Sequence, residues 1–212
     1  MKDYQEKFIR LALSAEALIF GDFTLKSGRN SPYFFNAAKM LNTKFLTDLS
    51  ECYTKTLQDL DVSFDSIYGP AYKGIFLASI IGASLGKSDL DIPVSFNRKE
   101  EKDHGEGGDI IGQLPSGNVL IVDDVISAGT AARESIEKIK SIGANPKVML
   151  VGLDRQEKGS SEISAKAELE NDFGLTVSSI VNLDLLISFV SDNPNFKEFK
   201  SDLEEYRSNW GA

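Results

Sequence analysis

The residues best suited to chemistry lie between positions 119 and 131, which read Val-Leu-Ile-Val-Asp-Asp-Val-Ile-Ser-Ala-Gly-Thr-Ala. Four aliphatic residues are followed by two adjacent carboxylates, Asp123 and Asp124. A continuous apolar run is typical of a strand buried on both faces of a parallel sheet, and ligands of such sheets bind at the carboxyl ends of the strands. The turn Ser127-Ala128-Gly129-Thr130 then offers N–H groups and hydroxyls before a predicted helix, an arrangement that binds anions.

Two common phosphate-binding motifs do not fit this turn. A Walker A loop requires Lys after its last Gly, whereas Thr130 follows Gly129 here, and a dinucleotide fingerprint requires three spaced glycines where this turn has one. Two carboxylates accept hydrogen bonds from a sugar diol while the turn binds a phosphate, so the pattern predicts a ribose 5-phosphate ligand. The alternative is a buried strand with a solvated aspartate pair at its end, which leaves the glycine and hydroxyls without a role.

Around this motif the sequence predicts alternating strands and helices. An amphipathic helix is expected within 1–18, short strands within 20–40 and a helix at 43–60. Further strands are expected at about 64–69, 92–97, 119–123, 147–153 and 176–181, and helices at about 72–86, 131–141, 162–173, 183–190 and 195–207. Such alternation predicts a single α/β domain over residues 1–212, with a mostly parallel central sheet flanked by helices.

Composition excludes several classes of function. The 212 residues are 42% hydrophobic, enough for one sizeable core. The net charge of −9 argues against nucleic acid and anionic membranes as partners, and no segment resembles a signal or membrane-spanning helix. Cys52 is the only cysteine, which excludes an intrachain disulfide or a cysteine-based zinc site, and we expect a cytoplasmic protein.

A long polar segment, about 98–110, separates two of the predicted strands. It contains Arg98, Lys99, Lys102 and the only histidine of the chain, His104, among glycines and acidic residues. Loops of this length inside a compact domain are usually functional or disordered. We therefore expect a mobile cationic loop, with a solvated charged loop as the alternative.

Five motifs together resemble the orotate phosphoribosyltransferase family of the type I phosphoribosyltransferases. They are the segments 24–29, 33–35, 69–74 and 98–105, and the 119–131 motif, which resembles the signature for 5-phosphoribosyl 1-pyrophosphate (PRPP). The similarity runs in matching order through essentially the whole chain. It implies the type I phosphoribosyltransferase fold, with a small N-terminal hood over about 1–40 and a long flexible catalytic loop.

The resemblance implies an enzyme that transfers the 5-phosphoribosyl group from PRPP to orotate, giving orotidine 5′-monophosphate and pyrophosphate in pyrimidine biosynthesis. It also implies Mg²⁺ held mainly by substrate oxygens and water, with Asp123 and Asp124 contributing through water. A homodimer with shared active sites is expected, in which the 98–110 loop reaches the neighbouring site.

The same resemblance assigns residues. The catalytic residues would be Lys102, His104, Asp123 and Asp124. The PRPP-binding residues would be Lys26, Tyr72, Lys73, Arg98, Lys99, Lys102, His104, Asp123, Asp124, Val125, Ile126, Ser127, Ala128, Gly129, Thr130 and Ala131. The orotate-binding residues would be Lys26, Phe34, Phe35, Ser127 and Arg155. Adjacent strand residues point to opposite faces, so one Phe is expected in the core.

The resemblance also implies that residues 69–74 form a pyrophosphate loop with a cis peptide bond at Ala71-Tyr72. Two other functions remain open. A phosphoribosyltransferase for a purine or uracil would share the PRPP motif, although Phe34, Phe35 and Arg155 favour an acidic pyrimidine. A regulator that senses PRPP and binds nucleic acid would carry a DNA-binding extension or a basic face, and the sequence shows neither.

Overall fold

The computed structural model describes residues 1–25, 28–88, 90–102 and 108–212, and for 99–102 and 108 it describes the backbone alone. The strands are β1(Leu18–Thr24), β2(Asn30–Phe35), β3(Ser66–Gly69), β4(Val94–Lys102), β5(Gly108–Gly112), β6(Asn118–Ile126), β7(Asn145–Asp154) and β8(Thr176–Asn182). The α-helices are α1(Asp3–Ser14), α2(Thr43–Leu60), α3(Lys73–Leu85), α4(Thr130–Ser141), α5(Ala165–Phe173), α6(Leu183–Asp192) and α7(Lys200–Trp210). Three short 3-10 helices are η1(Ala37–Met40), η2(Gly86–Ser88) and η3(Lys197–Phe199).

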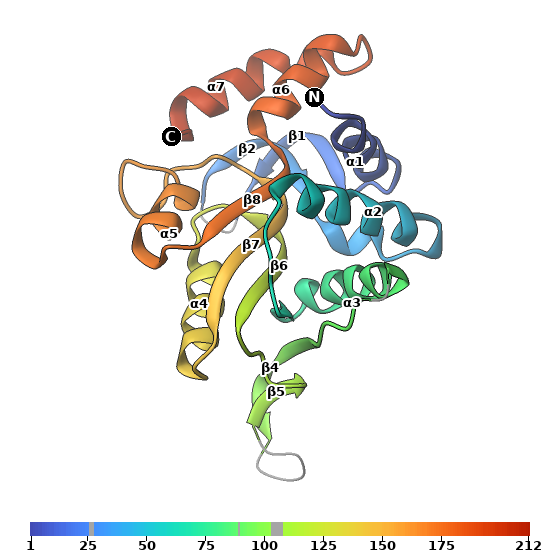
Figure 1. Cartoon of the computed structure of the whole chain (residues 1–212). Helices are drawn as coiled ribbons and strands as arrows, with labels where there is room; N and C mark the ends of the chain where they lie inside the picture. Colours follow the sequence, from blue (N-terminus) through green and yellow to red (C-terminus); the bar gives the residue numbers. More distant parts are fainter. Residues whose placement is uncertain (26–27, 89, 103–107) are drawn as a thin grey trace.

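The central sheet has the strand order β5-β4-β3-β6-β7-β8, and its pairs are parallel except β4 with β5 (Figure 1). The mostly parallel sheet predicted from the alternating pattern is thereby confirmed. From β3 the chain steps to β4 on one side, whereas β6, β7 and β8 follow on the other side. The strand order therefore reverses between β3 and β6, and in open α/β sheets ligands bind in the crevice at such a reversal.

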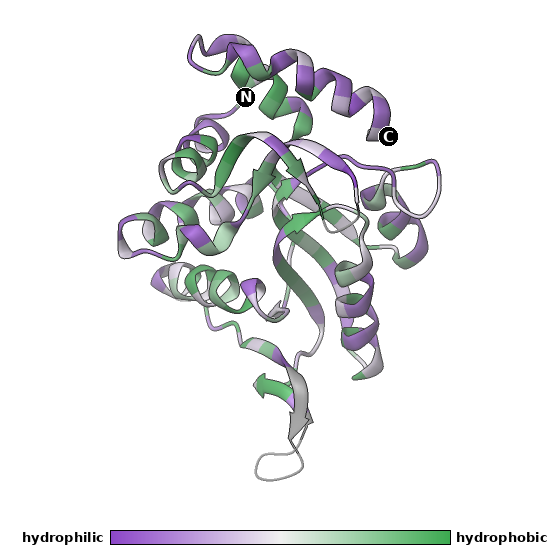
Figure 2. Cartoon of the chain, turned by 180° about the vertical axis from the view of Figure 1, so that it is seen from behind, coloured by the Kyte–Doolittle hydropathy of each residue, from purple (hydrophilic) through white to green (hydrophobic). Residues whose placement is uncertain are grey.

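Helices cover both faces of this sheet. Val119 to Val122 of β6 are fully buried, as the continuous apolar run predicted. Leu120 and Val122 pack in a cluster with residues of α1, α2 and α3, whereas Val119 and Ile121 pack in a second cluster with α4 and α5. Figure 2 shows mostly hydrophobic strands in the sheet, a largely hydrophilic α4 and α7, and a largely hydrophobic α3. The sheet is thus the middle layer of three, and no helix among the described residues is long and apolar enough to cross a membrane.

A separate antiparallel hairpin, β1 with β2, lies at one end of the molecule together with α6 and α7 (Figure 1). Tyr33 of β2 meets Tyr206 of α7 edge to face, with 5.9 Å between ring centroids. The predicted N-terminal hood of about 1–40 contains α1 and this hairpin, and C-terminal helices pack against the same region. The limits of the hood stay a prediction.

The polar segment 98–110 differs from the loop that we expected. β4 continues to Lys102, and β5 begins at Gly108 and pairs antiparallel with it, with Lys102 opposite Gly108. The prediction of a loop throughout was wrong, because the ladder of this hairpin is formed by backbone groups and the segment has no apolar alternation that would indicate strands. Residues 103–107, with His104, lie outside the described residues, and the predicted mobility stays a prediction.

Candidate active site

The two predicted aspartates lie near the carboxyl end of β6, beside the start of α3. Asp124 is only 4% exposed, and its Oδ2 accepts a 2.6 Å charged hydrogen bond from Lys73 Nζ. Asp123 is partly buried, and its Oδ1 accepts the backbone N–H of Asp124 at 2.8 Å. Lys73 and Asp124 are 51 positions apart in the sequence and meet because β3 and β6 are neighbours.

Burial, together with repulsion from Asp124, raises the pKa of Asp123 well above its usual range. Lys73 offsets this only in part, because its ammonium lies on Asp124. A raised carboxylate pKa indicates a place where negative charge is insufficiently compensated. The pair is therefore suited to a ligand or ion that brings positive charge.

The loop from Gly69 to Gly74 joins β3 to α3 in a tight path. The peptide bond between Ala71 and Tyr72 is cis, as predicted. The chain is so close here that a Cβ on Gly74 would lie 2.7 Å from the carbonyl oxygen of Val122. Only a residue without a side chain fits there, and the loop is thereby pressed against β6.

Asn97 of β4 holds the same loop from its other side. Its Oδ1 accepts the backbone N–H of Ala71 at 2.7 Å, and its Nδ2 donates to the carbonyl oxygen of Arg98 at 3.2 Å. We did not predict Asn97 from the sequence. The one available signal was an amide residue at the carboxyl end of a predicted strand.

The turn from Ser127 to Gly129 connects β6 to α4. Gly129 has a φ of 81° and caps the N-terminus of the helix, which begins at Thr130 rather than at the expected 131. Left-handed backbone of this kind favours glycine. The first N–H groups of a helix have no acceptor within the helix, so this turn presents the donors that a phosphate requires.

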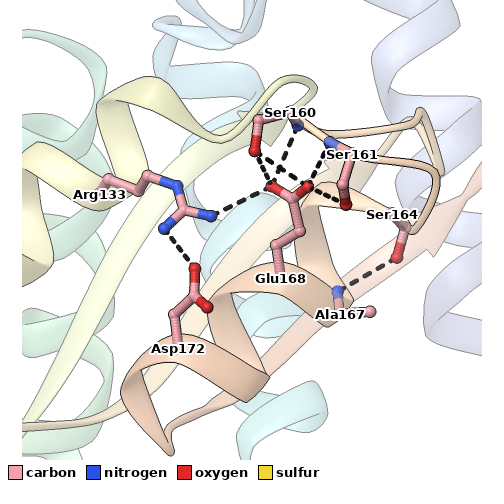
Figure 3. A network of polar contacts seen from close by, with 7 residues as sticks. All are labelled: Arg133, Ser160, Ser161, Ser164, Ala167, Glu168 and Asp172. Carbon is pink, nitrogen blue, oxygen red and sulfur yellow. Dashed lines mark hydrogen bonds and ion pairs between the residues drawn. The ribbon is translucent and has the colours of Figure 1, made fainter.

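A polar network braces this turn from the side of α5 (Figure 3). The carboxylate of Glu168 accepts hydrogen bonds from the N–H and hydroxyl groups of Ser160 and Ser161 and a 3.1 Å ion pair from Arg133 in the first turn of α4. These hydrogen bonds, that of the Ser161 hydroxyl foremost, lower the pKa of Glu168 to about 2. Glu168 thus stays ionised and ties α4 to the loop after β7 at any physiological pH.

The two phenylalanines of β2 point to opposite faces, as strand geometry requires. Phe34 is 40% exposed, whereas Phe35 is 8% exposed and packs in the core against Phe8, with 6.1 Å between ring centroids. The expectation that one of them belongs to the core is confirmed. Because the side chain of Phe35 lies in the core, a contact with a base would come from its backbone, and this contact remains a proposal.

Arg155 follows β7 and is almost completely buried. Its backbone N–H donates to the carbonyl oxygen of Ile126 at 3.1 Å, which places it beside the anion-binding turn. Its Nε donates to Glu157 Oε1 at 2.5 Å, and its Nη2 donates to both Ser31 Oγ and the Tyr206 hydroxyl at 2.8 Å. We did not predict these partners, because Ser31 and Tyr206 lie 124 and 51 positions away in the sequence, and no local pattern indicates that Glu157, two positions away, turns toward the guanidinium.

The structure describes little of the side-chain contacts of several predicted site residues. Lys26 and His104 lie outside the described residues, and the side chains of Lys99 and Lys102 are likewise not described. Arg98 is partly buried on β4, and its Nη1 has no hydrogen-bond partner among the described residues. Tyr72 is exposed at the N-terminus of α3. The remaining predicted residues, Val125, Ile126, Ser127, Ala128, Gly129, Thr130 and Ala131, lie together at the end of β6 and the start of α4.

Among the described residues, no group of three or more His, Cys, Asp or Glu side chains forms a metal site. Asp123 and Asp124 supply only oxygen donors, which Mg²⁺ prefers, and the raised pKa of Asp123 shows negative charge that a cation would compensate. This donor set fits a Mg²⁺ ion that takes most of its ligands from substrate and water.

Comparison with known proteins identifies the family. Residues 38–168 match the model of the phosphoribosyl transferase domain. The chain is 48% identical over 212 residues to an orotate phosphoribosyltransferase of Marinobacter nauticus, with both chains covered completely. The chain belongs to the orotate phosphoribosyltransferase family. An orotate phosphoribosyltransferase from Escherichia coli K12 is likewise 48% identical over 213 residues, again with both chains covered completely.

The fold of this orotate phosphoribosyltransferase family member agrees with a solved structure. The crystal structure of the orotate phosphoribosyltransferase from Francisella tularensis covers 97% of this chain and 100% of its own, with a TM-score of 0.84 and 37% identity. The predicted type I phosphoribosyltransferase fold and the family resemblance are thereby confirmed.

Proposed function

We propose that this protein transfers the 5-phosphoribosyl group from PRPP to orotate, giving orotidine 5′-monophosphate and pyrophosphate in pyrimidine biosynthesis. The observation that carries this proposal is the meeting of three features at one sheet edge. The carboxylates of Asp123 and Asp124, the glycine turn before α4 and the tight 69–74 loop all converge where the strand order reverses.

The aspartates bind the ribose and the turn binds its 5-phosphate. Asp123 and Asp124 accept hydrogen bonds from the ribose 2′ and 3′ hydroxyls, directly or through metal-bound water. Their negative charge also stabilises the oxocarbenium-like sugar that forms as the bond to pyrophosphate breaks. The backbone from Val125 to Ala131, with the hydroxyls of Ser127 and Thr130, surrounds the phosphate.

Pyrophosphate leaves with several negative charges, and cationic side chains stabilise them. Lys73, Tyr72 and the backbone of the 69–74 loop bind it, and Lys26 contributes a further positive charge. Arg98, Lys99, Lys102 and His104 also bind it, with Lys102 and His104 as the catalytic residues among them. Asp123 and Asp124 would hold Mg²⁺ through water, with substrate oxygens as its main ligands, and the ion would neutralise further charge on the phosphates.

Orotate lies between the turn and the β1–β2 hairpin. Phe34 contacts the flat ring of the base. Polar or backbone contacts come from Phe35, Lys26 and Ser127. Arg155 pairs with the acidic substituents of the base. We further propose a cytoplasmic homodimer in which hairpin residues of one subunit reach the site of the other. These assignments rest on the family and, for the described residues, on their positions.

Steady-state assays with PRPP and a panel of bases test this function. We expect strong preference for orotate over uracil, adenine, hypoxanthine and xanthine, because Arg155 offers a charged partner that neutral bases leave unpaired. Preferred turnover of any other base would refute the substrate assignment. Absence of turnover with every base would instead favour a sensor of PRPP.

A further inference from the structure

One carboxylate, Glu157, is the centre of a buried network outside the PRPP site. It is 3% exposed, and its Oε1 accepts the Nε of Arg155 and the hydroxyl of Tyr206, each at 2.5 Å. Its Oε2 accepts Arg29 Nη1 at 2.7 Å. Two arginines and one tyrosine thus contact a single buried carboxylate. Burying such charges is costly, and the three ionised groups, Arg29, Arg155 and Glu157, together carry a net positive charge.

The network restricts Arg155 almost completely. Its Nε and Nη2 are bound by Glu157, Ser31 and Tyr206, and its guanidinium lies 4.1 Å from the centroid of the Tyr33 ring. Nη1 is the remaining donor of the planar fork, and it makes no hydrogen bond to any residue that the structure describes. Because Nε, Nη2 and one face of the planar guanidinium are all held, the remaining Nη1 group has a fixed orientation.

The C-terminal segment completes this arrangement. Tyr206 comes from α7, and the last residues then pair with the chain that follows Arg155. The N–H of Lys158 donates to the carbonyl oxygen of Trp210 at 2.9 Å, and the N–H of Ala212 donates to that of Gln156 at 3.1 Å. The Arg29 guanidinium lies 4.9 Å from the Trp210 ring centroid. The end of the chain therefore holds the loop on which Arg155 and Glu157 lie.

We propose that Glu157 and Tyr206 are positioning residues that aim Nη1 of Arg155 at the acidic group of the base, so that α7 belongs to the base-binding site. This inference rests on the proposed role of Arg155 in orotate binding. It also gives a physical reason for base selectivity, because a pre-oriented charged donor loses little entropy on binding and stays unpaired with a neutral base. Neither residue contacts the substrate itself.

Kinetic constants of Glu157→Gln and Tyr206→Phe test the proposal. We expect the orotate KM to rise about tenfold in Glu157→Gln and somewhat less in Tyr206→Phe, while the PRPP KM changes by less than about twofold. The matched control is Arg207→Ala on the same helix, which removes the exposed 2.8 Å ion pair with Asp184 and leaves the network intact. Its orotate KM should equal that of the wild type.

A double-variant cycle with Arg155→Ala separates positioning from general support. We expect Arg155→Ala to raise the orotate KM. Adding Glu157→Gln to Arg155→Ala should raise this KM little further, because the oriented Nη1 donor is already absent. If Arg155→Ala raises the orotate KM but Glu157→Gln and Tyr206→Phe both leave it near the wild-type value, the positioning role alone is overturned. Equal rises in the KM of both substrates would show structural loosening and overturn it too.

The remaining outcomes are equally decisive. An unchanged orotate KM in Arg155→Ala refutes the role of Arg155 and the inference with it, while orotate turnover by the wild type preserves the proposed function. A wild-type protein that does not turn over orotate refutes the proposed function itself. If Glu157→Gln does not fold, Tyr206→Phe decides, because it removes one hydroxyl and keeps every charge.

Discussion

At the scale of single residues, the charge balance of the aspartate pair matters most. Burial, followed by repulsion from Asp124, raises the pKa of Asp123 at the end of β6, and Lys73 pairs with Asp124 rather than with Asp123. Such an aspartate pair is unfavourable for the unliganded protein and becomes favourable when a cation or a cationic sugar arrives. Stability and function therefore make opposite demands on Asp123.

We predict that Asp123→Asn stabilises the unliganded protein at pH 8 and abolishes most turnover. The raised pKa means that the folded state binds the Asp123 proton more tightly than the unfolded state, so this group lowers stability as pH rises above the unfolded pKa. Asn carries no charge and still accepts the Asp124 N–H. The gain should be about 1 kcal/mol at pH 8 and shrink toward pH 4. Denaturant unfolding at both pH values measures it, and a pH-independent difference would contradict this explanation.

Lys102→Ala should lower kcat far more than it raises the PRPP KM. The charge of Lys102 is needed most as pyrophosphate leaves, so its loss should cost on the order of 100-fold in kcat. Initial rates at saturating substrates measure this effect. Lys147→Ala, at an exposed position of β7, is the matched control for loss of one positive charge. An unchanged kcat would remove Lys102 from the chemistry.

At the scale of elements, the end of each strand decides where a functional group is placed. The 69–74 loop is fixed between β6, which it approaches at Gly74, and Asn97 of β4. The turn before α4 is fixed in turn by the Glu168 network and by α5 (Figure 3). Both segments that we propose to bind phosphate are therefore held by neighbours in the fold as well as by their own sequence.

Asn97→Ala should weaken catalysis without changing the fold. It leaves the partly buried N–H of Ala71 without its acceptor, which we expect to lower stability by about 1 kcal/mol and kcat/KM for PRPP about tenfold. Thermal unfolding and initial rates measure the two effects. Ser79→Ala on the exposed side of α3 controls for loss of a polar side chain nearby. Wild-type kcat/KM in Asn97→Ala would show that the loop keeps its conformation unaided.

At the scale of the whole molecule, the site exists because parallel strands end at one edge. Segments from β3, β4, β6 and β7 meet there, although they span from Ser66 to Asp154 in the sequence. The hairpin β1–β2 and α7 then cover the side of Arg155. In the proposed complex, negative carboxylates and negative phosphates lie together at this edge of the sheet, which requires added positive charge.

Removal of Mg²⁺ should therefore abolish most turnover. We expect excess chelator to lower the rate at least about 100-fold, because the metal neutralises phosphate charge in the crevice. The measurement is the initial rate with chelator and after Mg²⁺ is restored, which should recover activity. Full turnover in excess chelator would contradict the metal's role.

Much of this protein follows from sequence patterns. The buried run 119–122, the carboxylates after it and the glycine turn predict a parallel strand, its ligand edge and an anion site, because each depends on neighbours in the chain. Sequence patterns predicted strands less well where the strands pair through their backbones without burying apolar side chains. The 98–110 segment was expected to be a loop for that reason, and its strands were missed.

Local sequence by itself determined the order of the helices and of the parallel strands, the family resemblance and the residue types at the proposed PRPP site. Only the tertiary structure decided which distant groups meet: Lys73 with Asp124, Asn97 with Ala71, and Ser31 and Tyr206 with Arg155. The physical reason is that periodicity and turn chemistry act over a few residues. Contacts across a sheet or with a C-terminal helix depend instead on strand order and packing, which no local pattern records.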